Sequence, residues 1–364
     1  MPNLLIAPTA FKGTFSPLTV ANAMLQGARD SRRALSCRIV PLADGGDGTI
    51  ETLNHVLGGA LHTVDVTGPI AKRVSAPWLK LGDTGVVELA GACGIAHLQG
   101  HLEPMRAHTY GLGELMKHCI HSGVHKVFVA VGGSASTDGG MGALQALRAE
   151  FHGESGEPII ERGGAALNRV AYANVTGCER LVKDVQVTIV TDVTNPLLGP
   201  QGAARIFAPQ KGASPEEVEL LEHGLERFAD VMEATTRRHW RDLKGAGAAG
   251  GTAYGLAVAL DSKIVPGFEW LADLLKLDEH LEWADMVISG EGRFDSQSLQ
   301  GKVLGSLIDR CVHWEKPLTV VTGSIDESVA VPYGVQVVCV ESDRASEYDI
   351  ARAVEASLST QVAG

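Results

Sequence analysis

The sequence has no closely spaced cysteines, no excess of basic residues and no long hydrophobic run, and each absence argues against a class of protein. Its six cysteines are scattered without a C-x-x-C pair, as is typical of reduced thiols in a cytosolic protein and not of a disulfide framework or a zinc site. The formal net charge of −12 argues against a nucleic-acid or anionic-membrane surface, because both require a basic patch. No apolar run approaches the roughly 20 residues that span a bilayer, and the N-terminus lacks the features of a signal peptide. We therefore expect a cytoplasmic protein without nucleic-acid or membrane partners.

The common nucleotide-binding motifs are absent or misplaced. Gly301-Lys302 is followed by Val303, and Ser296 stands where a Walker A motif has its first glycine. The H-R-D and D-F-G signatures of protein kinases are also missing. Residues 245–250 match the dinucleotide fingerprint G-x-G-x-x-G, but they follow a polar segment and not a strand. An NAD site is therefore not expected there, and the glycines serve either as a phosphate cradle or for close packing.

Short apolar runs alternate with amphipathic stretches along most of the chain, which indicates α/β architecture with mostly parallel strands. Between residues 61 and 90, three apolar runs follow one another without helices, which predicts a mixed sheet there. The expected strands are 3–7, 38–42, 61–66, 74–81, 85–90, 126–131, 186–191, 286–289, 318–321 and 335–340. The expected helices are 18–29, 47–57, 111–122, 140–150, 215–234, 270–283, 301–312 and 349–359.

The strict alternation of strands and helices at both ends of the chain predicts a discontinuous domain. We expect residues 1–64 plus 284–364 to form one doubly wound domain. Residues 65–283 would form an inserted α/β domain with the mixed sheet. A chain of 364 residues is long enough for two such domains, each with its own core.

Charged residues occupy short glycine-rich turns, nearly all directly after an apolar run. Because ligands of α/β proteins bind outside the carboxyl ends of the strands, we expect these turns to line one cleft. Glycines let the backbone approach a bound group, lysines and exposed N–H groups suit phosphate, and carboxylates suit Mg²⁺ and proton removal from an alcohol. The combination predicts phosphoryl transfer. The turns are Phe11-Lys12-Gly13, residues 44–49, residues 132–140, Thr191-Asp192, residues 209–212 and residues 290–293.

Structural alternatives stay open for these turns. Lys12 is either a cation for a phosphoryl or carboxylate oxygen or a solvated loop lysine. Residues 132–137 either bind an anion at the N-terminus of the next helix or form a tight turn that Asp138 caps. Asp192 and Asn195 suit either Mg²⁺ or a substrate hydroxyl.

The turn at the end of the strand near residue 288 carries charges of both signs. Asp295 and Lys302 could complete a nucleotide site with this turn. Alternatively, Glu291 and Arg293 merely pair with each other.

Taken in order, these segments resemble those of the bacterial glycerate kinases of the two-domain α/β type. They span nearly the whole chain in the family's order, which makes the resemblance more specific than any single motif. The matching segments are Ala7-Pro8-x-x-Phe11-Lys12-Gly13 and residues 41–49, 132–140, 192–199, 202–204, 209–213, 245–251, 289–295 and 301–302. The family usually has Asp-Ser where this chain has Thr9-Ala10, and it often has Glu where Asp47 stands, so position 9 cannot supply an essential acid here.

The resemblance implies ATP- and Mg²⁺-dependent phosphorylation of D-glycerate to phosphoglycerate, with 2-phosphoglycerate favoured and ADP released. It implies a Rossmann- or flavodoxin-like domain beside a second α/β domain, with the active site between them. The expected partners are ATP and D-glycerate, and the expected state is a monomer or a homodimer.

The roles that we expect follow from this chemistry, since phosphoryl transfer demands positioning and charge neutralisation. Lys12 and Lys211 would neutralise the phosphoryl group or the glycerate carboxylate. Asp44 or Asp192 would accept the hydroxyl proton, and the other would help to hold Mg²⁺. The expected substrate- or nucleotide-binding residues are Gly132, Gly133, Ser134, Thr137, Asp138, Asn195, Glu291, Arg293, Asp295 and Lys302.

Two other functions remain open. One is a kinase that acts on a related hydroxy acid, such as a tetronate or a tartronate-derived acid. The other is a non-catalytic ligand-binding or sensor protein on the same fold. ADP release across a panel of such acids would separate the three.

Overall fold

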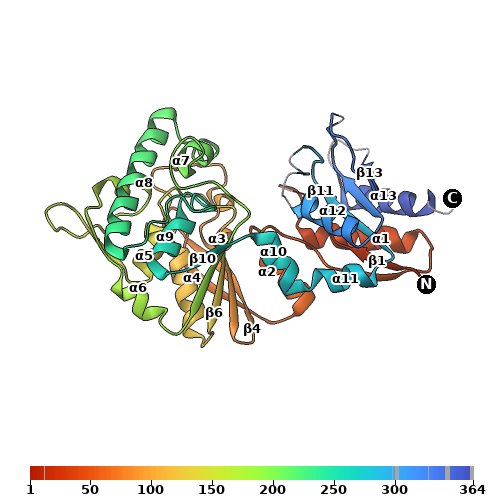
Figure 1. The fold of residues 1–364 in the computed structure, drawn as a ribbon, viewed down its shortest axis with the longest axis horizontal. Coiled ribbons are helices and arrows are strands. Elements are labelled where there is room, and N and C mark those ends of the chain that lie inside the picture. Colours follow the sequence, from red (N-terminus) through yellow and green to blue (C-terminus); the bar gives the residue numbers. More distant parts are fainter. Residues whose placement is uncertain (12, 297, 300–302, 327, 341–344, 361–364) are drawn as a thin grey trace. The chain divides into compact units, whose positions relative to one another are not determined.

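The computed structural model describes residues 1–11, 13–296, 298–299, 303–326, 328–340 and 345–360, which fall into two units (Figure 1). Unit 1 comprises residues 1–44, 51–58 and 268–364, and unit 2 comprises residues 45–50 and 59–267. Unit 1 is therefore discontinuous, with unit 2 inserted in its sequence. The chain passes between the units after residues 44, 50, 58 and 267, whereas the sequence pattern places the boundaries near residues 65 and 284.

Unit 1 is built on a five-stranded parallel sheet with the strand order β13-β12-β11-β1-β2. The order reverses at β1, because the chain first runs outward to β2 and later returns to β11 on the other side. The sheet is therefore doubly wound, as the sequence predicts. Its strands are β1 (Asn3–Ile6), β2 (Ser36–Ile39), β11 (Met286–Glu291), β12 (Leu318–Thr322) and β13 (Val335–Cys339). Its helices are α1 (Pro17–Asp30), most of α2 (Thr49–Leu57) and α10 (Gly267–Leu275), and all of α11 (Leu277–Trp283), α12 (Val303–His313) and α13 (Glu347–Thr360).

Local sequence explains how α1 begins and which face it buries. Pro17 occupies the first turn, and the Ser16 hydroxyl oxygen accepts a hydrogen bond from Thr19 N at 3.3 Å, so the helix has both features of a favourable N-terminus. Val20 and Met24, four residues apart, share one face of the helix. They belong to one buried cluster with Leu4, Ile6, Ile288, Val321, Ile350 and Val354. Helices α1 and α13 thus cover the same face of the sheet.

Unit 2 is built on a six-stranded mixed sheet with the order β10-β9-β6-β5-β4-β3. Strands β3, β4 and β5 pair antiparallel, whereas β5, β6, β9 and β10 are parallel, which confirms the mixed sheet. The strands are β3 (Ala60–Thr67), β4 (Arg73–Leu81), β5 (Thr84–Glu88), β6 (Lys126–Ala130), β9 (Gln186–Val190) and β10 (Lys263–Val265), with a hairpin of β7 (Glu150–His152) and β8 (Tyr172–Asn174). The α-helices are α3 (Leu89–Cys93), α4 (Tyr110–His121), α5 (Met141–Ala146), α6 (Thr176–Leu181), α7 (Ala203–Phe207), α8 (Pro215–Thr236) and α9 (Thr252–Leu260).

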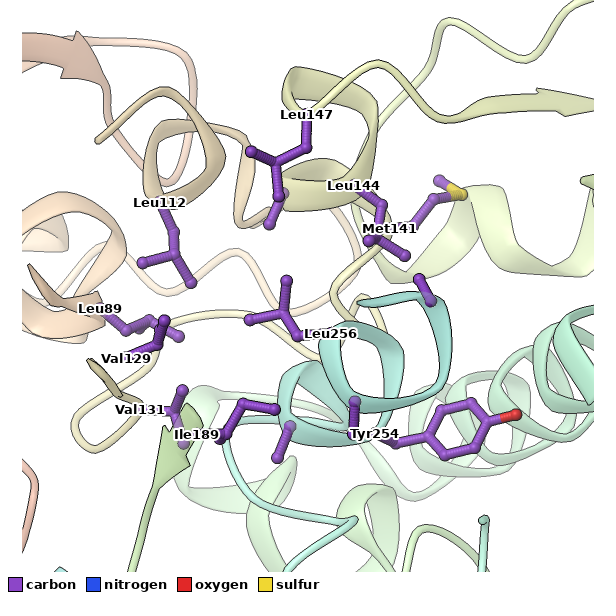
Figure 2. Packing of buried hydrophobic residues seen from close by; sticks show 14 of the residues in the cluster. Leu89, Leu112, Val129, Val131, Met141, Leu144, Leu147, Ile189, Tyr254 and Leu256 are labelled. Atoms are coloured by element: carbon purple, nitrogen blue, oxygen red, sulfur yellow. The ribbon is translucent and has the colours of Figure 1, made fainter. Parts of the chain in front are cut away.

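The core of unit 2 is wrapped around α9. Every residue of this helix is buried, so it has no polar face and lies inside the unit. Leu256 on α9 lies among Leu112, Val129 and Leu144, which come from α4, β6 and α5 (Figure 2). The loops that follow β6 and β9 are thus attached to a dry, close-packed layer.

Several elements differ from the sequence-based expectation. The helix expected over residues 140–150 ends at Ala146, and the one expected over 270–283 is two helices, broken at Lys276 with φ 54°. The short strands β7, β8 and β10 were not predicted. Among the described helices, none combines the length and the hydropathy that crossing a bilayer requires.

Candidate active site

The parallel strands β5, β6 and β9 end at one edge of the sheet in unit 2. Adjacent residue pairs along them, such as Val87↔Val129 and Val129↔Ile189, fix this register. The segments that follow the three strands therefore start side by side at the edge where α/β proteins bind ligands.

Residues 45–50 lie against this edge. Gly45 O accepts a hydrogen bond from Gly132 N at 3.4 Å, and a Cβ atom on Gly45, where φ is +77°, would lie 2.8 Å from Val190 Cγ1. A Cβ on Gly132 would lie 2.5 Å from Gly46 Cα. The glycines thus allow backbone to pack on backbone. Asp44, half-buried, directly precedes this contact.

A buried carboxylate anchors the same segment from β5. Glu88 is 6% exposed, and its Oε1 accepts a hydrogen bond from Ile50 N at 2.6 Å. Ile50 lies in the first turn of α2, where backbone N–H groups lack partners within the helix. Glu88 therefore fixes the start of α2 and, with it, the turn that carries Asp44 and Asp47.

Asp138 organises the loop after β6. The side chain is completely buried, its Oδ2 accepts hydrogen bonds from Thr109 N and Thr109 Oγ1, both at 2.8 Å, and from Gly142 N at 3.2 Å, and its Oδ1 accepts one from Gly140 N at 3.2 Å. Asp138 thus caps the six-residue helix α5, which is the structural alternative left open for this loop. The N–H groups of Gly140 and Gly142 bind the protein's own carboxylate.

Lys211 reaches the same loop from the 3₁₀ turn Pro209–Lys211. It is 3% exposed, and its Nζ donates to Ser134 Oγ at 2.7 Å and to Ser136 O at 2.5 Å. It forms no ion pair with the part of the chain that the structure describes. Burial lowers the pKa of Lys211 to about 7, an effect that the negative charge of Asp138 partly opposes.

Two hydroxyl groups beside Lys211 remain without hydrogen-bond partners among the described residues. Ser136 Oγ and Thr137 Oγ1 are both buried. Native proteins usually satisfy buried polar atoms with protein groups, water or a ligand. The loop thus combines a buried cation with unused hydroxyl groups.

The loop after β9 carries Asp192 and Asn195. Asp192 Oδ1 accepts a hydrogen bond from Gly267 N at 2.7 Å, which orients this carboxylate at the start of α10. Asn195 Nδ2 donates to Gln201 O at 2.8 Å, and Asn195 O accepts from Gly247 N at 2.9 Å. Asp192 therefore ties the loop to the start of α10, and Asn195 holds the backbone of the loop itself.

The glycine-rich turn at residues 245–251 packs against two of these loops. Gly250 O accepts from Gly139 N at 3.0 Å, and a Cβ on Gly250 would collide with Ser136 O. A Cβ on Gly245 would lie 3.1 Å from Val193 O. Of the two uses that the sequence leaves open for these glycines, close packing is what the contacts show.

In unit 1, the segments after β1 and β11 also start side by side. Thr9 N and Thr9 Oγ1 both donate to Gly290 O, at 2.9 and 3.0 Å, so residue 9 has a structural role there. Arg293 Nε lies 3.6 Å from Asp295 Oδ2, and Asp295 Oδ1 accepts from Ser298 N at 3.3 Å. Lys12 and Lys302 lie outside the described residues.

The described residues contain no group of three or more His, Cys, Asp or Glu side chains that could enclose a metal ion. The hard carboxylate oxygens of Asp44 and Asp192 still suit Mg²⁺, which proteins usually bind through one or two carboxylates together with substrate phosphates. Each of these carboxylates, taken singly, therefore suits a Mg²⁺ ion that is held mainly by substrate phosphates.

Sequence reasoning did not identify Glu88, Thr109 and Glu222. Glu222 is buried, and its Oε1 accepts from Gly199 N at 2.6 Å, which ties α8 to the loop after β9. Glu88 had a usable signal, because it is the only charged residue in the apolar run from Gly85 to Cys93. Thr109 and Glu222 carried no comparable signal.

These features define a two-unit α/β protein with loops and charged groups gathered at the carboxyl ends of its strands. Residues 4–363 match the family model of the glycerate kinase family, and the chain belongs to this family. It is 36% identical over 331 residues to the glycerate 2-kinase of Escherichia coli (strain K12), covering 90% of this chain and 87% of that one. It is 34% identical over 338 residues to the glycerate kinase of Bacillus subtilis (strain 168), covering 91% and 88%.

A crystal structure from Salmonella typhimurium LT2, of a chain named as a candidate glycerate kinase 2, has the same fold. Its TM-score to this chain is 0.84 at 33% identity, over 99% of this chain and 97% of the other. The similarity therefore covers both units and the segments between them.

Proposed function

We propose that this protein is a cytoplasmic kinase that transfers the γ-phosphoryl group of ATP to D-glycerate, with 2-phosphoglycerate as the favoured product and ADP as the second product. A glycerate hydroxyl oxygen forms the new bond to phosphorus, the bond between the γ-phosphorus and the β-phosphate oxygen breaks, and the hydroxyl proton passes to a carboxylate. Membership of the glycerate kinase family supports the reaction class. The observation that carries the site is Lys211 at the sheet edge of unit 2, which is buried and forms no ion pair with the residues that the structure describes.

Lys211 supplies positive charge to the glycerate carboxylate or to the transferring phosphoryl group. Its environment is dry, so its attraction to an anion is stronger than it would be at the surface. Ser134 and the backbone of Ser136 hold its Nζ in place. The hydroxyls of Ser136 and Thr137 and the backbone of Gly132 and Gly133 offer further groups to phosphate or carboxylate oxygens.

Asp44 and Asp192 divide two tasks, acceptance of the hydroxyl proton and retention of Mg²⁺. When bound, Mg²⁺ would neutralise charge on the phosphate oxygens. The hydrogen bond from Gly267 N orients Asp192, and the packing of Gly45 against Val190 supports the turn that carries Asp44. Because the side chain of aspartate is short, these backbone contacts largely determine where each carboxylate lies.

The nucleotide contacts are proposed for the second set of strand ends, in unit 1. Glu291 is the last residue of β11, and Arg293 and Asp295 follow it. The end of β11 lies where the strand order of the doubly wound sheet reverses, which is the usual ligand-binding position of this fold. Lys12 and Lys302 belong to the same proposal on the basis of the sequence resemblance.

The decisive experiment mixes the full chain with ATP, Mg²⁺ and D-glycerate, measures ADP release, and identifies the product by proton and phosphorus NMR. Release of ADP that depends on D-glycerate, with phosphorus on the 2-hydroxyl, is the expected result. Phosphorylation of the 3-hydroxyl would correct the position only. Faster turnover of a tetronate or tartronate-derived acid would reassign the substrate. If no acid caused ADP release, the kinase proposal would be wrong and a non-catalytic binding protein would be the remaining alternative.

A further inference from the structure

A second pocket opens in unit 2 and shares no residue with the candidate site. Its volume is about 320 Å³. It lies beside the start of α4, the end of α5 and the β7 strand. Its lining residues are Tyr110, Gln145, Ala149, Glu150, Phe151, His152, Pro158, Ile159, Ile160 and Arg162.

Arg162 brings a positive charge to this pocket. Its guanidinium carbon lies over the Tyr110 ring, 3.4 Å from the ring centre, in a cation–π contact. Arg162 Nε is buried. Among the residues that the structure describes, it has no hydrogen-bond partner and its side chain forms no ion pair. A buried guanidinium N–H without an acceptor is costly, and a planar carboxylate is the acceptor that best matches its geometry.

Gln145 adds an unused acceptor. Its Nε2 donates to Ile159 O at 2.9 Å and to Glu161 O at 3.4 Å. Because two carbonyl oxygens require a donor at that position, the orientation of the amide is fixed. Gln145 Oε1 is then buried without a partner, so a ligand that fits must donate a hydroxyl or an N–H group.

The rest of the pocket selects against small polar anions. Ala149, Phe151, Pro158 and Ile159 provide apolar walls, with Ile160 at 78% exposure on the surface. Glu150 places a negative charge in the lining, which disfavours a doubly charged phosphate. Glycerate has no apolar part that could use these walls.

We propose that this pocket binds a small monocarboxylic acid that has an apolar body and a hydroxyl or N–H donor next to the acid group. The carboxylate pairs with Arg162, the donor reaches Gln145 Oε1, and the apolar body covers the walls. The site is separate from the one proposed for glycerate, and its occupancy does not depend on that function.

The test is isothermal titration of the full chain with 2-hydroxy-4-methylpentanoate, which has all three features. We expect saturable binding to the wild type and at least about tenfold weaker binding to Arg162→Met, because a charge-assisted hydrogen bond to a buried group is lost. Arg169→Met is the matched control, since Arg169 pairs with Glu161 on the surface and should bind as the wild type does. We also compare this hydroxy acid with 4-methylpentanoate, which lacks the hydroxyl. The wild type should bind the hydroxy acid more tightly than 4-methylpentanoate, and Gln145→Met should bind the two acids equally tightly.

Three outcomes would overturn the proposal: no saturable binding at millimolar concentration, equal binding by the Arg162→Met and Arg169→Met variants, or displacement of the acid by D-glycerate. Thermal unfolding of Arg162→Met shows whether the variant is folded. If Arg162→Met is unfolded, the Gln145→Met variant is the deciding test. The proposal would then be refuted if Gln145→Met preferred the hydroxy acid over 4-methylpentanoate as strongly as the wild type does. Glycerate turnover is measured separately, so failure of either proposal is recognised on its own.

Discussion

The two units bury charge very differently. Among the described residues, the buried Asp, Glu, His and Lys side chains are Glu88, His108, Asp138, Lys211, Glu222 and Glu233, and all of them lie in unit 2. The buried polar residues described in unit 1 are hydroxyl residues such as Ser289 and Thr322. Its ion pairs, such as Arg352 with Glu355, are partly or fully exposed.

Burying a charge costs free energy unless a partner compensates for it. Among the described Asp, Glu, His and Lys residues, this cost therefore falls on unit 2. Asp138 and Glu233 recover it through several hydrogen bonds to backbone and side chains, and Glu222 accepts one from Gly199 N and lies 3.8 Å from Arg205 Nε. Lys211 does not recover it, because its acceptors are a hydroxyl and a carbonyl oxygen. Unit 2 therefore uses most of its buried charges to fix loops, whereas Lys211 is held by neutral acceptors alone.

The largest effect is expected from replacing the two aspartates of the candidate site, Asp44 and Asp192. Asp44→Asn and Asp192→Asn should each lower kcat for glycerate phosphorylation, and the one that accepts the proton should do so by about 10²–10⁴. Steady-state ADP release measures the effect, with the exposed Asp184→Asn as control. Near-normal turnover in both variants would remove the acid–base role from these positions.

Removal of the buried cation should have the next largest effect. Lys211→Met keeps most of the apolar volume but removes the charge, and we expect kcat/KM for D-glycerate to fall by about 10²–10³. Lys183→Met, on the surface of the same unit, should be active. Equal rates for the two variants would show that Lys211 is a structural lysine.

Stability should separate the units as well. Glu233 accepts hydrogen bonds from Trp240 N, Arg241 N and the Arg241 side chain, so Glu233→Ala should lower the unfolding free energy by about 3 kcal/mol. In unit 1, Arg352→Ala breaks an exposed pair and should cost less than about 0.5 kcal/mol. Urea unfolding of both variants tests the contrast, and similar losses would contradict it.

The pH dependence gives the smallest effect and refines the role of Lys211. Because burial lowers its pKa to about 7, Lys211 is charged in both folded and unfolded states below pH 7. Between pH 7 and its unfolded value it is neutral only when folded, so its contribution to the unfolding free energy rises with pH in that window. An anion bound beside it restores the proton. Affinity for D-glycerate should then fall by up to about tenfold per pH unit above 7.

Calorimetry in two buffers of different ionisation enthalpy would detect this proton uptake. The Lys211→Met variant should show none. Glycerate affinity that is independent of pH between 7 and 9 would mean that the bound acid does not contact Lys211.

The sequence predicts the larger elements because their patterns are long and regular. The parallel strands of unit 1 and the capped helix α8, which begins with the Ser214–Glu217 capping box, could both be inferred. The break at Lys276 could not, because a lysine in the left-handed region leaves no periodicity signal. Strand β10, three residues long, is too short to be distinguished from a loop.

The candidate site could be predicted by residue type but not by contact. Asp138 and Lys211 were proposed from their turns, but their hydrogen-bond partners could not be predicted. Asp138 accepts from Thr109, which is 29 residues away in the sequence, and Lys211 donates to Ser134, 77 residues away. The three-dimensional proximity of residues 45–50 and 132 follows from glycine contacts that no periodicity encodes. Roles for these residues remain predictions that the variants above test.

The position of β1 in its sheet has a consequence for biosynthesis. This strand is synthesised before unit 2, and it pairs on one side with β2 and on the other with β11, where Leu5 is paired with Val287. About 280 residues, including all of unit 2, must therefore be translated before the nascent strand meets its second neighbour. Unit 2 can form its core while β1 still lacks β11 as a partner. Chaperones that shield the hydrophobic side chains of β1 would therefore matter most during synthesis of unit 2.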